Sequence, residues 1–156
     1  MKRFALIFIL VAAAIGLSAT TMQLTNFVEL LNALQRGEDV QMVAHLGRSA
    51  YADEQDVPTP DMTFGINIDN WEYYAPMAMG FEKGFIVFGE TRLIASPLGE
   101  GYVHSYTQAI VMDDGSVELT YGYLDAATME AVMDETFTGD ISRGRNESSP
   151  FLFFQR

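Results

Sequence analysis

Cysteine is absent from the 156-residue chain. Without a thiol, the protein can form neither disulfide bonds nor a thiolate nucleophile, and it cannot bind a metal through sulfur. Histidine is scarce as well, because only His45 and His104 carry an imidazole. A metal site built from three histidines is therefore excluded.

Basic residues are also few. The chain has 9 basic and 21 acidic residues and a net charge of −12. Such a surface repels nucleic acid phosphates and anionic membranes, so we expect no nucleic acid partner. A solvated acidic surface is the simplest interpretation, although the same charge suits attraction of cations or of a basic partner.

Long hydrophobic runs are missing except at the N-terminus. Lys2 and Arg3 precede an apolar run over residues 4–17, and the small residues Ser18 and Ala19 follow it. This order is typical of a secretory signal peptide. The run of about 14 residues is shorter than the roughly 20 residues that span a bilayer.

We therefore predict that residues 1–19 are a signal peptide and that residues 20–156 form one domain. The expected location is secreted, either extracellular or periplasmic, with no membrane span after removal of the signal. An uncleaved anchor is the alternative, because Leu17 stands where a smaller residue would favour cleavage.

One amphipathic helix is expected near the start of the mature chain. An i, i+3, i+4, i+7 spacing unites Phe27, Leu30, Leu31 and Leu34. Thr25 is a plausible N-cap, and Gly37 can adopt the left-handed conformation that closes a helix. The pattern predicts a helix over residues 26–36 whose apolar stripe packs on a sheet.

Most of the remaining chain alternates between apolar and polar residues with a period of two, which predicts strands. The expected strands cover residues 40–46, 62–69, 85–95, 101–112 and 117–124, and PFLFFQR closes the chain as a last strand or an apolar tail. We expect a mainly β (α+β) fold, a small antiparallel barrel or sandwich with the N-terminal amphipathic helix. A second short helix is predicted after Asp125, a good N-cap that precedes a short stripe of Met129, Val132 and Met133.

The stretch VMDDGSVELT at residues 111–120 has the composition of a calcium loop. If Gly115 were the invariant glycine of such a loop, Ile110, Met112 and Tyr121 would occupy ligand positions, and none of them offers the required oxygen. Asp-Gly between two alternating runs instead predicts a hairpin turn.

The order of these segments resembles the VirK family of small secreted proteins. The resemblance covers residues 24–154 and is strongest in FGETRL at 88–93 and in DDGSVELTYGYLDAAT at 113–128. It implies no catalytic residues, because the family's biochemical activity is unassigned. It also implies a cysteine after the first strand and another near the C-terminal end, where this chain has Ser49 and Gly139. The absence of both cysteines would fit the loss of a single disulfide bond between these two positions.

Two groups of residues are candidate binding sites. Asp53, Glu54, Asp56 and Asp61 lie in an exposed acidic loop that could bind calcium weakly, and no other cofactor is expected. Trp71, Tyr73 and Tyr74 would form an adaptable contact surface for an unknown protein or carbohydrate partner if they are exposed. If buried, they close one end of the sheet.

Asn146 begins an Asn-Glu-Ser glycosylation motif, which matters only in a eukaryotic host.

The first functional hypothesis is a secreted, non-catalytic interaction protein of the VirK type. The alternatives are an acidic extracellular matrix or weak calcium-binding protein, and a small secreted hydrolase. No motif supports a nucleophile and base, and His45 and His104 are interpreted as polar strand positions.

Overall fold

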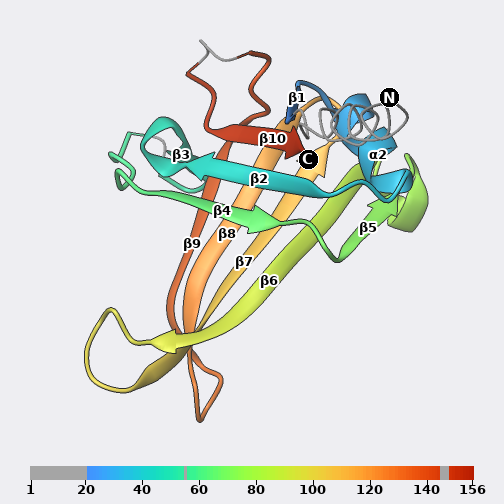
Figure 1. Cartoon of the computed structure of the whole chain (residues 1–156). Coiled ribbons are helices and arrows are strands. Elements are labelled where there is room, and N and C mark those ends of the chain that lie inside the picture. The colour runs from blue at the N-terminus through green and yellow to red at the C-terminus, as the bar shows by residue number, and fades with distance from the viewer. Residues whose placement is uncertain (1–20, 55, 145–147) are drawn as a thin grey trace, which may run out of the picture.

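Two antiparallel sheets and one α-helix make up the computed structural model, which describes residues 21–54, 56–144 and 148–156. The smaller sheet has the order β1 (Met22–Leu24), β10 (Phe151–Gln155), β2 (Val40–His45) and β4 (Thr63–Asn67). The larger sheet has the order β3 (Ala50–Tyr51), β9 (Ala131–Asp140), β8 (Ser116–Asp125), β7 (Tyr102–Met112), β6 (Phe85–Ala95) and β5 (Trp71–Tyr74). The smaller sheet crosses in front of the larger one (Figure 1).

The mainly β fold is confirmed, and of the two predicted architectures the sandwich-like one describes it. Within the described residues, β3 and β5 lie at opposite edges of the larger sheet and do not pair with each other, so the sheet is not a closed barrel. The strands expected at 40–46, 62–69, 85–95, 101–112 and 117–124 are all present with shifts of one or two residues, and the closing stretch is a strand. The short strands β1, β3 and β5 and the long β9 were not predicted.

The core lies between the two sheets. Alternate side chains of each strand point inward, as the period of two requires. From the smaller sheet the buried residues include Met42, Ile66, Phe151 and Phe153, and from the larger sheet Ile86, Phe88, Leu119 and Phe137. Phe88 and Phe153 meet edge to face with ring centroids 6.2 Å apart, which joins the two layers at their centre.

The predicted N-terminal helix is present as α2 (Phe27–Gln35), with its apolar side buried. Its N-cap is Asn26 and not Thr25, because the Asn26 Oδ1 accepts the Glu29 backbone N–H at 3.0 Å. The backbone N–H of Thr25 instead donates to the Glu29 carboxylate at 2.7 Å. The two contacts are reciprocal, like a capping box displaced by one residue. Gly37 has φ +71°, as expected of a residue that ends a helix.

The predicted second helix is wrong. Asp125 caps a tight turn, in which its Oδ1 accepts the backbone N–H groups of Ala127 at 2.9 Å and Thr128 at 2.8 Å. The chain then reverses into β9, which pairs along β8 and buries Phe137. Met129 and Val132, the expected apolar stripe, are exposed. Pairing with β8 satisfies the backbone groups along one side of β9, whereas so short a stripe would offer a helix little apolar burial.

The hairpin predicted at Asp-Gly is confirmed between β7 and β8. Gly115 has φ +90°, and Asp114 Oδ1 accepts the backbone N–H of Ser116 at 3.0 Å. Hydrogen bonds from Lys83 and then Ser116 hold the pKa of Asp114 well below its usual value. Asp113 accepts the Gly84 backbone N–H at 2.9 Å. Both aspartates therefore fix the turn and its neighbour β6.

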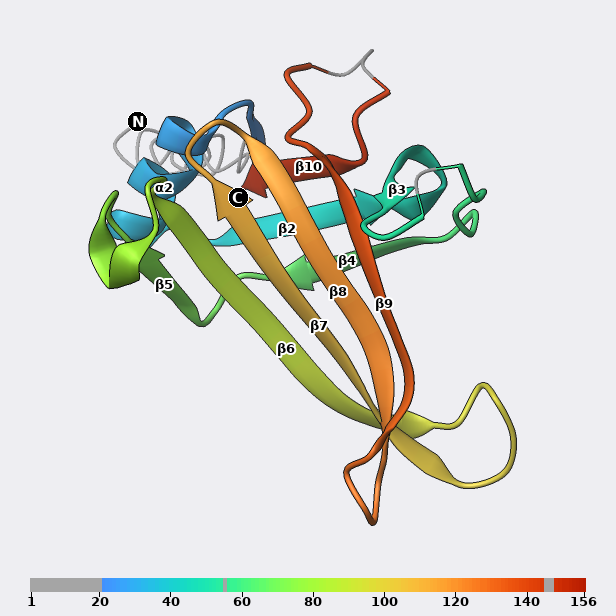
Figure 2. The same ribbon diagram turned by 180° about the vertical axis from the view of Figure 1, so that it is seen from behind.

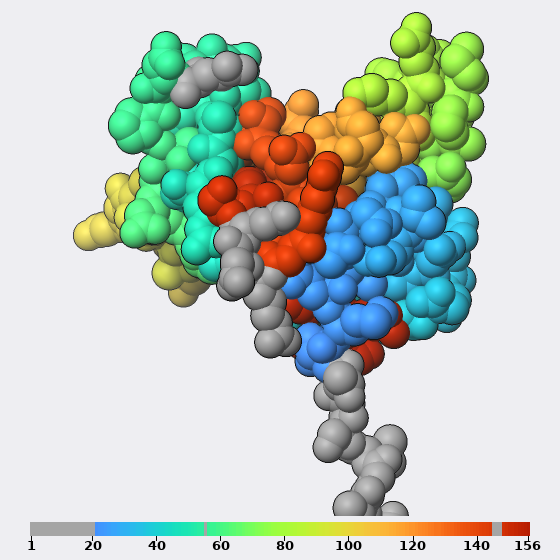
Figure 3. All heavy atoms as spheres, turned by 90° about the horizontal axis from the view of Figure 1, so that it is seen from above, coloured from blue at the N-terminus to red at the C-terminus, as the bar shows by residue number. Residues whose placement is uncertain are grey.

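The long strands β6 to β9 run well beyond the smaller sheet, so that their lower ends project from the body (Figures 1 and 2). From above, the β3–β4 loop and the β5–β6 connection form two projections with the ends of the long strands between them (Figure 3). The β5–β6 connection includes a short 3-10 turn, η2 (Ala78–Gly80). A second 3-10 turn, η1 (Leu46–Arg48), follows β2.

Close contact across the long strands depends on Gly122. A Cβ at this position would lie 2.3 Å from the carbonyl oxygen of Met133 and 2.7 Å from a ring carbon of Tyr106. We expect Gly122→Ala to lower the free energy of unfolding by about 1–3 kcal/mol, the usual cost of overpacking. Urea unfolding followed by circular dichroism measures this change.

Gly99→Ala is the matched control, because nothing lies within 4 Å of a Cβ at Gly99. Equal stability of the two variants would show that β8 and β9 can separate freely at this point.

Candidate binding groove

Strand β6 has an open edge. All eleven of its residues pair with β7, but only Phe85–Phe88 pair with β5 on the other side. In the described part of the chain, no strand pairs with residues 89–95 at that edge. Pairing on one side only leaves a row of backbone donors and acceptors unused.

The neighbouring contacts show which backbone groups are unused. The Gly84 carbonyl accepts the Asp113 N–H at 2.9 Å, and the Ser96 N–H donates to the Gly101 carbonyl at 2.9 Å. Both contacts reach toward β7, and backbone direction alternates along an antiparallel strand. Even-numbered residues of β6 therefore face β7. The N–H and C=O groups of Gly89, Thr91, Leu93 and Ala95 face the open edge.

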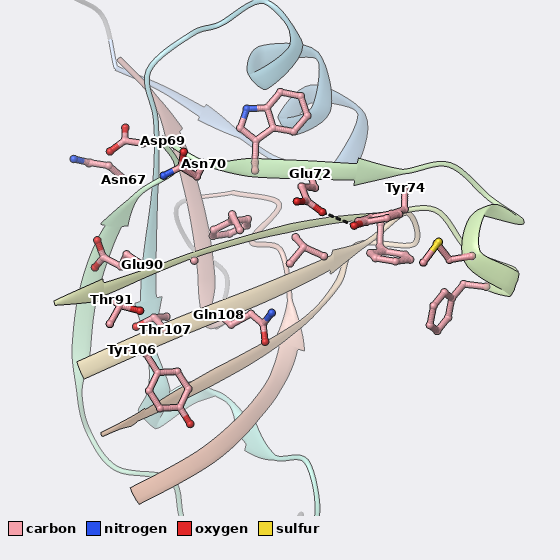
Figure 4. Close-up of a pocket in the computed structure, with 17 residues that line it drawn as sticks. Asn67, Asp69, Asn70, Glu72, Tyr74, Glu90, Thr91, Tyr106, Thr107 and Gln108 are labelled. Carbon is pink, nitrogen blue, oxygen red and sulfur yellow. Dashed lines mark hydrogen bonds between the residues drawn. The ribbon is translucent and has the colours of Figure 1, made fainter. Parts of the chain in front are cut away.

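A groove of about 1240 Å³ lies beside this edge (Figure 4). Its lining combines aromatic rings, carboxylates and amides. The aromatic members are Trp71, Tyr74, Phe81, Phe85, Phe88 and Tyr106; the carboxylates are Asp69, Glu72 and Glu90; the amides are Asn67, Asn70 and Gln108. Gly89 and Thr91 bring the open edge of β6 into the groove. Such a mixture of apolar surface and placed polar groups is typical of binding sites.

The three aromatic residues predicted as a contact surface lie on one strand but not on one face. Trp71 and Tyr73 pair with the inward-facing Phe88 and Ile86, whereas Tyr74 pairs with Phe85 on the outer face. Trp71 is half-buried and packs against the core. Tyr73 is partly exposed, with its ring 6.3 Å from that of Phe27. Trp71 and Tyr74 both line the groove, and Tyr73 does not.

The outer wall of the groove is a group of stacked rings. The Tyr74 and Phe85 rings stack with centroids 4.8 Å apart, and Phe81 meets Phe85 edge to face at 5.4 Å. The Tyr74 hydroxyl donates to Glu72, which raises the pKa of Tyr74. Phe81 is 58% and Met79 79% exposed, so this wall presents apolar surface to solvent.

On the opposite side of the groove, Glu90 accepts a hydrogen bond from Arg92 at 2.7 Å. These two residues and Ile94 share the inward face of β6 beyond the end of β5. Figure 4 shows Glu90 on β6 and, across from it, Asn67 at the end of β4 and Asp69 on the connection between β4 and β5. Among the described residues that line the groove there is no lysine or arginine.

The four acidic residues predicted to bind calcium do not lie together in the structure. Asp53 and Glu54 line a second groove together with Asp134 and Glu135 of β9. Asp56 is exposed elsewhere in the loop, and Asp61 packs beside Gly47. The described residues contain no group of three or more His, Asp or Glu side chains that could hold a metal ion. Calcium binding would therefore require the loop to bring its carboxylates together.

The two histidines lie apart from these grooves. His45 Nδ1 and Thr63 Oγ1 are 2.8 Å apart across β2 and β4, and His104 lies opposite Leu93 in the larger sheet. Neither imidazole lines the edge groove or the groove at the acidic loop. The predicted signal peptide of residues 1–19 and the glycosylation site Asn146 lie outside the described residues. None of the helices in the described ranges is long and apolar enough to cross a bilayer.

Known proteins resemble this chain in sequence or in fold. The model of the VirK family, described as VirK protein, matches residues 23–129. The chain therefore belongs to the VirK family, as the sequence resemblance predicted. It is also similar to the crystal structure of lpg1832, a VirK family protein from Legionella pneumophila, with 13% identity, a TM-score of 0.65, and coverage of 85% of this chain and 98% of the other. That likeness shows the fold alone. No match was found among curated proteins.

The structure brings together the two positions at which the resemblance implies cysteines. Ala50 of β3 pairs with Thr138 of β9, and continuing this register by one residue places Ser49 opposite Gly139. Neighbouring strands at such a pair lie within reach of a disulfide. A Cβ at Gly139, however, would lie 2.3 Å from the Pro150 ring. The proline ring fills the space that a side chain at residue 139 would need.

Two tyrosines of the larger sheet have pKa values above the usual one. Burial, followed by a hydrogen bond to Asp134, raises the pKa of Tyr106 to about 12. Burial, followed by a hydrogen bond to Tyr121, raises the pKa of Tyr123 to about 12. Unfolded tyrosine titrates near 10, so the unfolded state loses these protons first. Their stabilising contribution is complete below about pH 10 and is lost as the pH rises through about 12.

We expect tyrosinate absorbance of the folded protein to show a late phase near pH 12 that Tyr106→Phe reduces. Tyr123→Phe should reduce the same phase, because burial raises the pKa of that hydroxyl as well. A single early transition for all seven tyrosines would contradict the burial of these hydroxyls.

Proposed function

We propose that this VirK-family protein is exported and acts as a non-catalytic binding protein that holds a protein partner in the edge groove. The observation that carries the proposal is the meeting of exposed apolar side chains and unpaired backbone groups in one groove. Apolar anchors surrounded by polar groups are the usual basis of protein recognition. Export rests on the signal-like order of residues 1–19.

The groove offers binding groups rather than a catalytic arrangement. Its carboxylates Glu72 and Glu90 already accept hydrogen bonds from Tyr74 and Arg92. The described lining has hydroxyl groups but no histidine, and neither lysine nor cysteine. The His45–Thr63 pair lies away from this groove and adds no imidazole to it.

Replacing Met79 and Phe81 by alanine should weaken capture of the partner. Both side chains line the groove and are exposed, so their loss removes contact surface without disturbing the core. The tagged protein is incubated with the secreted fraction of its own organism, and captured molecules are quantified by mass spectrometry. Captured protein should fall at least tenfold with the groove variant, with an unchanged melting temperature.

The double variant Leu98→Ala with Tyr102→Ala is the matched control. These side chains are 58% and 66% exposed and lie outside the groove. Equal capture by the groove variant and by this control would place the binding surface elsewhere. Captured glycan without captured protein would replace the protein partner with a carbohydrate.

Weak calcium binding is a second candidate function. It is favoured by the four carboxylates of Asp53, Glu54, Asp134 and Glu135 around one groove and by the net charge of −12. Millimolar calcium should raise the melting temperature of the native protein, because a ligand that binds the folded state stabilises it. The rise should be lost in Asp53→Asn with Asp134→Asn, because both carboxylates line this groove.

Magnesium at the same concentration is the control for ionic strength. No shift with calcium, or an equal shift with both ions, would remove the calcium hypothesis. An acidic surface would then be the sole role of this loop.

A further inference from the structure

We infer that the open edge of β6 binds an extended, positively charged segment of the partner, which pairs with residues 89–95 as an added strand of the larger sheet. This inference rests on the proposed function, and it specifies the kind of partner and the way it is held. Two features carry it: the direction of the unused backbone groups and the charge of the groove.

The open edge of β6 presents backbone groups that can form hydrogen bonds with another strand. The N–H and C=O groups of Gly89, Thr91, Leu93 and Ala95 point away from β7, and these residues are exposed. An extended peptide pairs with such a row through main-chain hydrogen bonds. Seven residues offer a length of about 23 Å at roughly 3.3 Å per residue.

An added strand would occupy the line that β5 begins. Strand β5 reaches Phe88 through Trp71, and the chain before it turns away toward β4. The groove occupies the space next to the following residues, Gly89 and Thr91. Gly89 has no side chain, and a Cβ there would lie 2.5 Å from the Thr107 carbonyl oxygen. No side chain therefore covers the backbone at residue 89, where the added strand would meet the end of β5.

The charge of the groove selects a basic segment. Asp69, Glu72 and Glu90 line it, and the nearby Arg92 is bound to Glu90. Side chains of an added strand would alternate between the two faces of the sheet. One set would lie on the face of Glu90, and the other on the face of Thr91 and Leu93. A segment that alternates lysine or arginine with apolar residues satisfies both faces.

Other occupants fit these observations less well. A second copy of this chain would bring the same carboxylates together and carries the same net charge of −12. A carbohydrate could stack on the aromatic wall, but it has no main chain of amides to match the strand edge. Both are outcomes of the test below.

The probe is a blocked synthetic peptide of seven residues that alternates lysine and valine. It should bind the full protein and slow hydrogen exchange at the Thr91 and Leu93 amides. The same peptide N-methylated at every residue keeps its charge and side chains but cannot pair, and should bind at least tenfold more weakly. A glutamate–valine peptide should show no binding, and added salt should weaken the lysine peptide.

Two variants of the protein test the same contact. Thr91→Pro removes an edge N–H but spares the ladder to β7, and should weaken binding of the lysine peptide at least tenfold. Thr91→Val keeps the N–H and should bind within about twofold of the native protein. Asp69→Asn should weaken binding, whereas Glu118→Gln, an exposed change on β8 outside the groove, should not. If Thr91→Pro fails to fold, the N-methylated peptide decides the outcome.

Strand addition is overturned if the N-methylated peptide binds as well as its parent, or if folded Thr91→Pro behaves like Thr91→Val. It is also overturned if no peptide binds, if only oligosaccharides bind, or if sedimentation shows a dimer with these amides protected. Loss of capture by the Met79 and Phe81 variant together with a failed peptide test would leave the proposed function intact. Peptide pairing together with unchanged capture would reject the proposed function alone.

Discussion

The hydrogen-bonded ladder of β6, β7, β8 and β9 supports the rest of the structure. These strands have ten or eleven residues each and pair along almost their whole length. The smaller sheet covers only part of them, so the projecting part depends on backbone pairing and on contacts between neighbouring side chains. Nearer the smaller sheet, the hydroxyls of Thr120 on β8 and Thr136 on β9 are 3.1 Å apart, and the Tyr121 ring also packs on Phe64 of β4 at 5.3 Å.

Unequal strand length at one side of this ladder produces the groove. Strand β5 has four residues and its neighbour β6 has eleven, so the remaining edge has no partner in the described chain. Natural sheets protect such edges with charged side chains that point inward, and Glu90 with Arg92 fits that description. Glu90 with Arg92 is a neutral pair, so preference for a basic partner would come from the other carboxylates of the groove, Asp69 and Glu72.

Local periodicity was sufficient to predict most of the long strands and the core. Residues 40–45 alternate clearly because one face is buried, and Asp-Gly at 114–115 has the backbone freedom that the hairpin needs. Strand β9 was missed because it buries Phe137 but leaves many of its other side chains exposed. Asp125 was ambiguous, because the same carboxylate chemistry caps a helix and a turn. Sandwich and barrel differ in the long-range pairing of edge strands, which no local pattern specifies.

The groove could be predicted only in part. Trp71 and Tyr74 were recognisable as candidate contacts from their composition, and both line it. Their separation onto two faces follows from pairing with β6, which the irregular pattern around Trp71 does not reveal. The edge is open because no strand of the described chain pairs with residues 89–95 on that side. The amino-acid types in β6 do not distinguish it from a strand that is paired on both sides. Binding capacity here arises from topology, whereas side chains supply the selectivity.

Backbone pairing and ring packing hold β3 and β9 together where the family resemblance implies a disulfide. Around Ser49 and Gly139, β3 and β9 are joined by the rings of Tyr51 and Phe137, whose centroids are 5.0 Å apart, and by backbone pairing. Pro150 fills the space beside Gly139 and leads directly into β10, which lies between β1 and β2. Strand β10 thereby fixes both the start and the end of the described chain in one sheet. A covalent link between these positions would act chiefly on the unfolded chain, so its absence leaves the contacts between β3 and β9 in the folded state unchanged.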